Sequence, residues 1–165
     1  MRRTRFSRWP CSIARAVDIL GDWWTPIVIR EAFYGVRRFD DFQSSLKLSR
    51  NVLAQRLTRL VDEGIFERVQ YAERPARFEY VLTEKGLDLF SVLAAMSGWG
   101  DRWLDEGNGP PIQFHHTECG HDTRAEVVCE QCRQPLRHED VQSRLGPGYP
   151  ERLRGRALAT GRFSG

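Results

Sequence analysis

The sequence has no long apolar run, no secretory leader and few cysteines. No stretch approaches the roughly 18 consecutive apolar residues that a transmembrane helix needs. The basic N-terminus, residues 1–10, is not followed by the apolar segment of a secretory signal. Only four of the 165 residues are cysteine, and this set does not resemble the disulfide framework of a secreted domain. These absences predict a cytoplasmic protein without a membrane partner.

The motifs of common enzyme classes are absent as well. The chain has no glycine-rich phosphate loop, no G-x-S-x-G elbow and no H-E-x-x-H motif. The acid pairs Asp40–Asp41 and Asp62–Glu63 lie beside predicted helices, where helix capping and surface solvation explain them. We therefore expect a protein that is not an enzyme.

Carboxylates are also missing from one helix-like segment, residues 49–61. Ser49 offers an N-cap hydroxyl, and the pattern predicts a helix from Arg50 to Asp62. One face is apolar, and the other carries Arg50, Asn51, Gln55, Arg56 and Arg59. Ordinary amphipathic helices mix both charge signs on the exposed face. A face with Arg, Asn and Gln but no acid suits base edges in the major groove, which predicts binding to double-stranded DNA.

The flanking segments predict a helix-turn-helix followed by a β-hairpin wing. Phe39, Phe42 and Leu46 share one face of a preceding helix, which Lys47 and Leu48 interrupt. Two β-rich segments, residues 65–71 and 78–82, follow with a loop over residues 72–77. Besides the recognition helix, the predicted DNA contacts are Arg37, Arg38, Ser49, Arg74 and Arg77.

Two further helices are predicted upstream as a scaffold. Apolar residues from Ile13 to Leu20 repeat at helical spacing, and Gly21 is typical of the position just after a helix. The next helix, starting near Asp22 or Thr25 and running to about Tyr34, has little polar surface. It is expected to form the core, with Trp23 and Trp24 packed inside rather than lining a ligand cage.

The helix after the wing, predicted from Glu84 to about Leu104, carries two apolar stripes. The first contains Leu87, Phe90, Leu93 and Ala94 and is expected to pack onto the winged domain. The second has heptad-type spacing and contains Leu89, Val92, Met96, Trp99 and Trp103. A second stripe on a terminal helix predicts a homodimer interface, although the C-terminal segment folding over it is an alternative.

Three segments of the chain resemble the HxlR family of bacterial winged-helix transcription regulators: CSIARAVDILGDWWTPIVIREAFYGVRRFDDFQ, LSRNVLAQRLTRLVDEGI and YVLTEKG. The resemblance covers roughly residues 9–105, with Pro26 standing where the family usually has an aliphatic residue. It implies a mainly α fold with a small β-wing, an α+β winged helix-turn-helix with a long dimerisation helix. It also implies a homodimer that binds double-stranded DNA.

Cys11 is a candidate redox sensor by the same resemblance, since several such regulators are thought to sense oxidants or electrophiles through a cysteine at the matching position. It precedes the first predicted helix and follows four arginines, and both features favour the reactive thiolate. The alternative is a small buried residue beneath that helix.

A second cluster of cysteines suggests a structural zinc site. His116-x-x-Cys119 and Cys129-x-x-Cys132 are two knuckle-like pairs, and three thiolates with one imidazole complete a tetrahedral shell. His115 and His121 compete with His116 for the fourth position. A metal-free hairpin with ordinary thiols, or a redox pair formed by Cys129 and Cys132, are the alternatives.

The chain is thus predicted to comprise four parts. They are a basic arm at residues 1–10, the winged domain with its dimerisation helix at 11–106, a zinc-ribbon-like segment at 112–140, and a basic flexible tail at 141–165. The function expected is a homodimeric repressor that responds to an oxidant or another small effector. The alternative is a protein-docking module without sequence-specific DNA binding.

Overall fold

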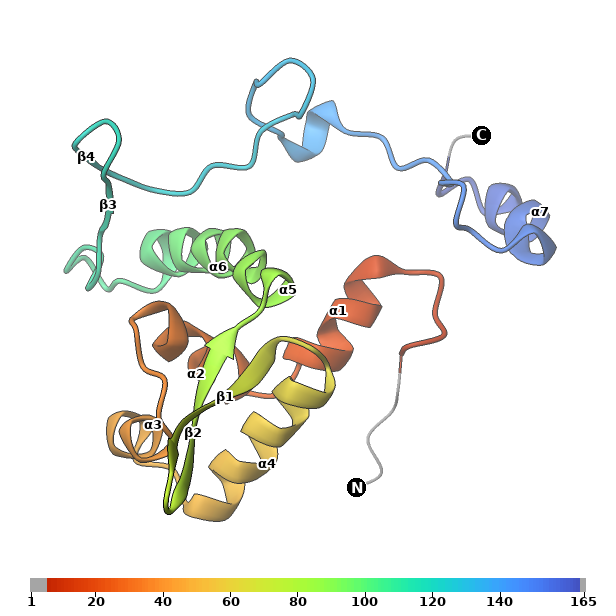
Figure 1. Cartoon of the computed structure of the whole chain (residues 1–165). Coiled ribbons are helices and arrows are strands. Elements are labelled where there is room, and N and C mark those ends of the chain that lie inside the picture. The colour runs from red at the N-terminus through yellow and green to blue at the C-terminus, as the bar shows by residue number, and fades with distance from the viewer. Residues whose placement is uncertain (1–5, 164–165) are drawn as a thin grey trace. The chain divides into compact units, whose positions relative to one another are not determined.

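The computed structural model describes residues 6–163, which form two compact parts of the chain (Figure 1). One part is Ile19–Ala125, and the other combines the N-terminal residues up to Asp18 with the residues from Glu126 onward. Helix α1 (Ser12–Leu20) spans the boundary between them. No helix among residues 6–163 is long and apolar enough to cross a membrane.

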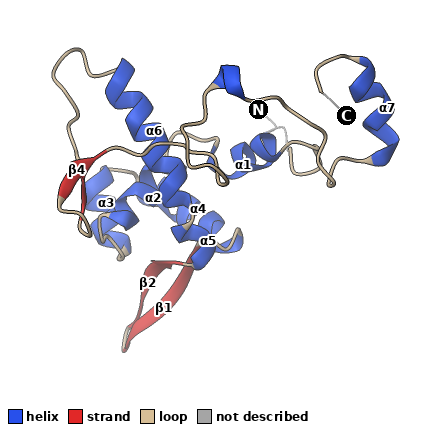
Figure 2. Cartoon of the chain, turned by 90° about the horizontal axis from the view of Figure 1, so that it is seen from above, coloured by secondary structure: helices blue, strands red, loops and turns tan. Residues whose placement is uncertain are grey.

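The larger part contains a winged helix-turn-helix. Figure 2 shows its helices gathered around the base of a two-stranded hairpin that extends away from them. The elements are α2 (Thr25–Phe33), α3 (Phe39–Leu46), α4 (Arg50–Asp62), β1 (Phe66–Glu73), β2 (Ala76–Leu82), α5 (Glu84–Leu87) and α6 (Leu89–Trp103). The α+β class, the helix-turn-helix and its bounds, residues 39–46 and 50–62, are confirmed.

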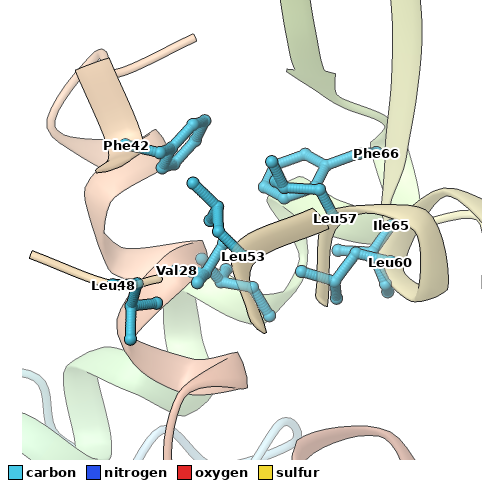
Figure 3. Close-up of a cluster of buried hydrophobic side chains, with 9 residues drawn as sticks. Val28, Phe42, Leu48, Leu53, Leu57, Leu60, Ile65 and Phe66 are labelled. Atoms are coloured by element: carbon cyan, nitrogen blue, oxygen red, sulfur yellow. The ribbon is translucent and has the colours of Figure 1, made fainter. Parts of the chain in front are cut away.

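The core lies where α2, α3 and α4 meet the base of the wing (Figure 3). Leu53, Leu57 and Leu60 of α4 point into it and are almost completely buried. They pack with Val28, Ile29, Phe42, Leu48, Ile65 and Phe66. Burial of each large side chain contributes about 1.5–3 kcal/mol, so α4 is fixed by its apolar stripe while its other face stays available.

The sequence sets the ends of α3 and α4. Lys47 adopts the left-handed conformation after α3, with φ of 51°, which ends that helix. Ser49 then takes an extended conformation, and its hydroxyl accepts a hydrogen bond from the Val52 N–H at 3.4 Å. This N-cap starts α4 at the predicted residue.

The wing is longer and its turn is tighter than the sequence predicts. Strand β1 pairs with β2 in antiparallel register from Phe66–Leu82 to Glu73–Ala76, with an irregularity between Gln70 and Ala72. The six-residue loop predicted over residues 72–77 is therefore wrong. Ala72 pairs with Arg77 and Glu73 pairs with Ala76 across the strands, so only Arg74 and Pro75 form the turn.

The helix after the wing is broken at Asp88 instead of running unbroken from residue 84. Thr83 caps the short helix α5 by accepting a hydrogen bond from the Gly86 N–H at 3.1 Å. A Cβ atom at Gly86 would lie 2.3 Å from the Ile65 backbone oxygen, so α5 is pressed against the base of the wing. Leu87, before the break, is 55% exposed, whereas Leu89 after it packs against the core with Leu93.

The predicted packing of the two tryptophans before α2 is wrong. Trp23 is 91% exposed and Trp24 is more than a third exposed, while Val28 and Ile29 supply the buried face of α2. The reason is that Asp22, in the link between α1 and α2, caps the N-terminal end of α2. Its Oδ1 accepts hydrogen bonds from the N–H groups of Trp24 and Thr25, so both tryptophans precede or flank the helix instead of lying on its inner side.

The remaining elements are small. The larger part also contains the hairpin β3 (Phe114–His116) and β4 (His121–Thr123). The smaller part contains the 3₁₀ turn η1 (His138–Asp140) and helix α7 (Glu151–Ala159). The segment predicted as a flexible tail, residues 141–165, thus includes helix α7. That helix buries Ala157, and the rings of Tyr149 and Phe163 lie 6.4 Å apart.

Candidate DNA-binding surface and cysteine sites

The outer face of α4 presents uncharged polar groups in a single row. Asn51, Gln55 and Thr58 are exposed and follow the i, i+4, i+7 spacing of one helical face, with exposed Arg50 at its start. Thr58 was missed by the sequence reasoning, although its spacing of seven residues from Asn51 places it on this face. The row consists of hydrogen-bonding side chains without a tertiary role.

Arg56 does not belong to that row. Its Nε lies 2.9 Å from Asp22 Oδ1 in an ion pair, although the N–H is not aligned for a hydrogen bond. The Arg56 side chain is 25% exposed and connects α4 to the start of α2. Burial opposes ionisation of Asp22, but the hydrogen bond from Thr25 and the charge of Arg56 outweigh it and lower its pKa. Arg56, predicted as a base contact, therefore lies in an ion pair that ties α4 to the residues before α2. Arg59 is only partly exposed.

The wing is held beside α3 by Arg38. Its Nε donates to Glu79 Oε1 at 3.0 Å, and its guanidinium lies 4.5 Å from the centre of the Tyr71 ring. The hydrogen bond to Glu79 raises the pKa of Arg38. The backbone contributes too, since the Tyr80 N–H donates to the Arg37 carbonyl at 2.8 Å. Arg38 is thus partly committed to positioning the wing, whereas the Arg37 side chain is exposed.

A polar groove of about 530 Å³ separates the start of α4 from the wing. Two of its arginines stack on aromatic rings: Arg50 lies 5.0 Å from the centre of Phe39, and Arg68 lies 4.1 Å from that of Phe78. Arg77 also lines the groove, and Arg74 is exposed at the turn. Arg68 was not singled out in the sequence, because β-strand alternation alone does not show its stacking partner. Asp40 and Asp41 line the same groove, so its charge is mixed.

Helix α6 exposes most of the predicted dimerisation stripe. Val92, Met96, Trp99 and Trp103 are all more than two-fifths exposed, and Trp103 reaches 63%. Leu89 differs because it packs against the winged core. A row of large apolar side chains on one helix face is unusual for a surface that meets only water.

Cys11 is exposed at the start of α1. Its Sγ accepts a hydrogen bond from the Ala14 N–H at 3.5 Å, which is the N-cap geometry of the first turn. The alternative of a thiol buried beneath the helix is therefore wrong. Of the four arginines before it, Arg2, Arg3 and Arg5 lie outside the described residues.

The predicted zinc ligands occur as two pairs. His116 Nδ1 lies 3.2 Å from Cys119 Sγ at the end of the β3–β4 hairpin. In the second pair, the backbone N–H groups of Cys132 and Gln131 point to Cys129 Sγ, and these hydrogen bonds lower the pKa of Cys129. All four cysteines are free thiols. Within residues 6–163, no three His, Cys, Asp or Glu side chains are gathered closely enough to hold a metal ion.

Comparison with known proteins identifies the domain that carries the α4 face. The HxlR-like helix-turn-helix family matches residues 19–108. An uncharacterized HTH-type transcriptional regulator of Mycobacterium tuberculosis is 39% identical over 142 residues, covering 86% of this chain and 90% of that protein.

Two solved structures extend the likeness to the fold. That of PA1607, a candidate transcription factor, has a TM-score of 0.76 at 34% identity and covers 87% of this chain and 99% of that one. The redox regulator HypR in its reduced form has a TM-score of 0.53 at 28% identity, covering 58% of this chain and 98% of that one. This chain belongs to the HxlR family and is a DNA-binding helix-turn-helix transcriptional regulator.

Proposed function

We propose that this regulator is a homodimeric repressor that inserts α4 into the major groove of its operator. The observation that carries this proposal is the exposed, acid-free row of Asn51, Gln55 and Thr58 beside a wing rich in arginine. Asn and Gln can make paired hydrogen bonds to the edge of adenine, and Thr can contact base edges or the thymine methyl group. A protein-docking helix facing an acidic partner would gain little from this row of neutral amides.

The phosphate contacts come from the start of α4 and from the wing. The first N–H groups of α4 and the exposed Ser49 form the positive end of a helix, which favours a phosphate. Arg50 stands at the same end, and Arg74 and Arg77 supply charge from the tip of the wing. These contacts fix the register on the duplex, and the α4 row then reads the bases.

The second copy binds through α6. Val92, Met96, Trp99 and Trp103 form an exposed apolar face whose burial against the same face of a partner gives a symmetric interface. A two-fold dimer presents two α4 helices to half-sites about one helical turn apart, or a multiple of this distance. Repression follows where such an operator overlaps a promoter.

Cys11 is the proposed trigger. Its thiol is exposed at a helix N-terminus, where an oxidant or electrophile can reach the Sγ atom. The similarity to HypR, a redox regulator by name, supports the same class of signal. Modification of the Sγ atom removes the contact with the Ala14 N–H and alters the start of α1.

The test is fluorescence anisotropy of a labelled DNA fragment from upstream of the protein's own gene. Reduced protein and diamide-treated protein are titrated in parallel, together with the Cys11→Ser variant. We expect salt-sensitive binding that diamide weakens in the wild-type protein and not in the variant. Equal binding before and after oxidation in both proteins would contradict the trigger but not the DNA surface. Binding no tighter than to random DNA would instead favour the docking alternative or an operator elsewhere.

A further inference from the structure

A cavity of about 280 Å³ lies between α2 and α6. Its lining residues come from α2 and the residue after it, from α6, and from Phe114 of β3. All of them belong to the part Ile19–Ala125, so the cavity lies within one compact part of the chain. A cavity of about 150 Å³ is enough to hold benzene, so this one has room for a substituted ring or two fused rings. Neither operator recognition nor Cys11 uses it.

Three aromatic rings form one wall of this cavity. The centre of the Phe90 ring lies 5.4 Å from that of Phe33 and 5.6 Å from that of Phe114, and all three residues line the cavity. Met96 also lines it, and its thioether adapts to the shape of a ligand and makes favourable contacts with aromatic rings. Because Phe90 is 47% exposed, part of this wall has no protein partner and can pack against an aromatic ligand.

The cavity and the proposed dimerisation face lie on different sides of α6. Successive residues of an α-helix are turned by about 100°. The cavity residues of α6 other than Met96 therefore share one side of the helix: Phe90, Leu93, Ala94 and Ser97. The dimerisation face lies on the other side, and Met96 stands between the two. A partner helix that buries the dimerisation face therefore leaves the cavity open to a small molecule.

Arg30 supplies a positive charge to the cavity. Its side chain is 43% exposed, and its guanidinium lies 5.7 Å from the centre of the Tyr34 ring, which also lines the cavity. Glu31 Oε1 accepts hydrogen bonds from Arg30 Nε and Nη2. Within residues 6–163, Arg30 Nη1 has no hydrogen-bond partner and no Asp or Glu lines the cavity. The Nη1 group can therefore donate to the carboxylate of a ligand.

We propose that this cavity binds a small aromatic carboxylate that acts as an effector. The ring of the ligand packs against Phe33, Phe90 and Phe114, and its carboxylate accepts hydrogen bonds from Arg30. The binding is non-covalent and does not depend on the proposed function, whereas its effect on operator binding does.

The Arg30–Glu31 pair connects the cavity to the helix-turn-helix. The second carboxylate oxygen of Glu31 accepts a hydrogen bond from the Ser45 hydroxyl of α3. A ligand carboxylate competes with Glu31 for Arg30, so it alters the contact that ties α2 to α3. Because α3 directly precedes α4, the bound effector lowers the operator affinity. By linkage, operator DNA lowers the affinity for the effector by the same factor.

The first test follows the Met96 methyl signal by NMR in the full-length protein with ¹³C-labelled methionine methyl groups. The chain has two methionines, Met1 and Met96, so two signals are expected. The probe is naphthoate, and naphthamide is its uncharged match. Naphthoate should shift the Met96 signal saturably with a Kd below about 1 mM, and naphthamide should bind at least about tenfold more weakly.

Two results of this titration would overturn the proposal. A Met96 signal that does not respond to naphthoate, or responds without saturation, would show that the cavity is not a binding site, including the case in which a second copy fills it. Equal affinity for naphthoate and naphthamide would show that the site does not recognise a carboxylate.

Substitution of Arg30 tests the charge. Arg30→Gln should weaken naphthoate binding about tenfold and leave naphthamide binding unchanged, because only the carboxylate uses the guanidinium. Arg102→Gln removes an exposed cation of α6 outside the cavity and is the matched control, which should bind naphthoate like the wild type. Unchanged naphthoate affinity in Arg30→Gln would overturn the role assigned to Arg30.

Filling the cavity tests its position. Ser97→Phe adds a ring at the cavity wall and should abolish the binding of both probes. Ser91→Phe adds the same ring at an exposed position outside the cavity and should retain binding. Circular dichroism checks both folds, and Ser97→Leu replaces Ser97→Phe where the larger side chain unfolds the protein. Undiminished binding to the folded Ser97 variant would overturn the proposal.

Operator titrations with and without saturating naphthoate test the effector role. We expect the ligand to weaken operator binding at least about fivefold in the wild type and to have no effect in the Ser97 variant. Unchanged operator affinity with the ligand bound would overturn the effector role. A protein that binds naphthoate but no operator fragment would contradict the proposed function instead, because the NMR titration is made without DNA.

Discussion

Neighbouring residues on α4 have different tasks. Gln55 is exposed and has no tertiary partner in its row, whereas Arg56 is paired with Asp22 of the link before α2. The sequence correctly indicated the polar face from its lack of acids. It could not indicate the Asp22–Arg56 pair, because that contact joins positions 34 residues apart and arises only when α2 packs against α4. Thr58 was overlooked because its chemistry is less diagnostic than that of Arg or Gln.

Gln55→Ala and Arg56→Ala should therefore have opposite profiles. Gln55→Ala should weaken specific DNA binding by about 1–3 kcal/mol with little change in the free energy of unfolding. Arg56→Ala should lower the free energy of unfolding by about 1–2 kcal/mol, because it leaves the partly buried Asp22 carboxylate without its cation. Operator titrations and urea denaturation measure the two effects. A normal footprint for Gln55→Ala would exclude it as a base contact.

Asp22 also predicts how stability depends on pH. Its pKa is lowered in the folded state, so the folded protein keeps the carboxylate ionised at a pH where the unfolded chain binds a proton. The stabilisation is complete above the unfolded pKa, near 4, and is lost as the pH falls through the lower folded value. Urea denaturation from pH 6 to pH 3 should show this loss, and Asp22→Asn should show a smaller one. The pKa of Glu31 is also lowered, so Glu31 accounts for part of the loss of stability that remains in the Asp22→Asn variant.

At the scale of helices and strands, local sequence signals predicted the helix-turn-helix correctly but misplaced the ends of several other elements. Ser49 and the apolar stripe of α4 lie next to each other in the chain, and both bounds of that helix were predicted correctly. The length of the wing depends on cross-strand pairing, and the break at Asp88 depends on how α5 packs against Ile65. Helix α7 was missed because its apolar content is low.

The contact between α5 and the base of the wing gives a sharp test. Gly86→Ala would place a Cβ atom 2.3 Å from the rigid Ile65 carbonyl, so one of the two segments must move. We expect a loss of about 1–3 kcal/mol in the free energy of unfolding, typical of overpacking. Gly100→Ala in α6 is the matched control, because nothing lies within 4 Å of the added atom. It should stabilise the protein by about 0.5–1 kcal/mol. Equal effects in thermal unfolding would show that α5 is not tightly packed.

At the scale of the whole molecule, the oligomeric state is the property that the sequence of one chain determines least directly. The family and the fold were recognisable from three continuous segments, but the proposed partner of α6 is a second chain. Sequence periodicity selected Leu89 for the interface together with the four exposed residues, and only packing shows that Leu89 faces the core. Val92, Met96, Trp99 and Trp103 form an exposed apolar face of α6, as the sequence predicts.

Met96→Asp combined with Trp99→Asp should convert the proposed dimer to monomers, because it places two charges in an apolar interface. Sedimentation velocity measures the change, and circular dichroism should show an unaltered helix content. Ser91→Asp, on an exposed polar position of α6, is the control and should leave the dimer intact. Persistence of dimers in the double variant would place the interface elsewhere. Monomers should also lose most operator affinity, since two half-sites no longer bind together.

The separation of tasks along α4 has a consequence for how new operators can be acquired. Asn51, Gln55 and Thr58 make no contribution to the buried core, so their identities can change without a cost in folding. Arg56, one position away from Gln55, is constrained by Asp22. Libraries that randomise only the three exposed positions should therefore yield folded proteins at high frequency, with altered base preference. Under the proposed function, substitutions confined to this one helical face would redirect the same scaffold to different promoters.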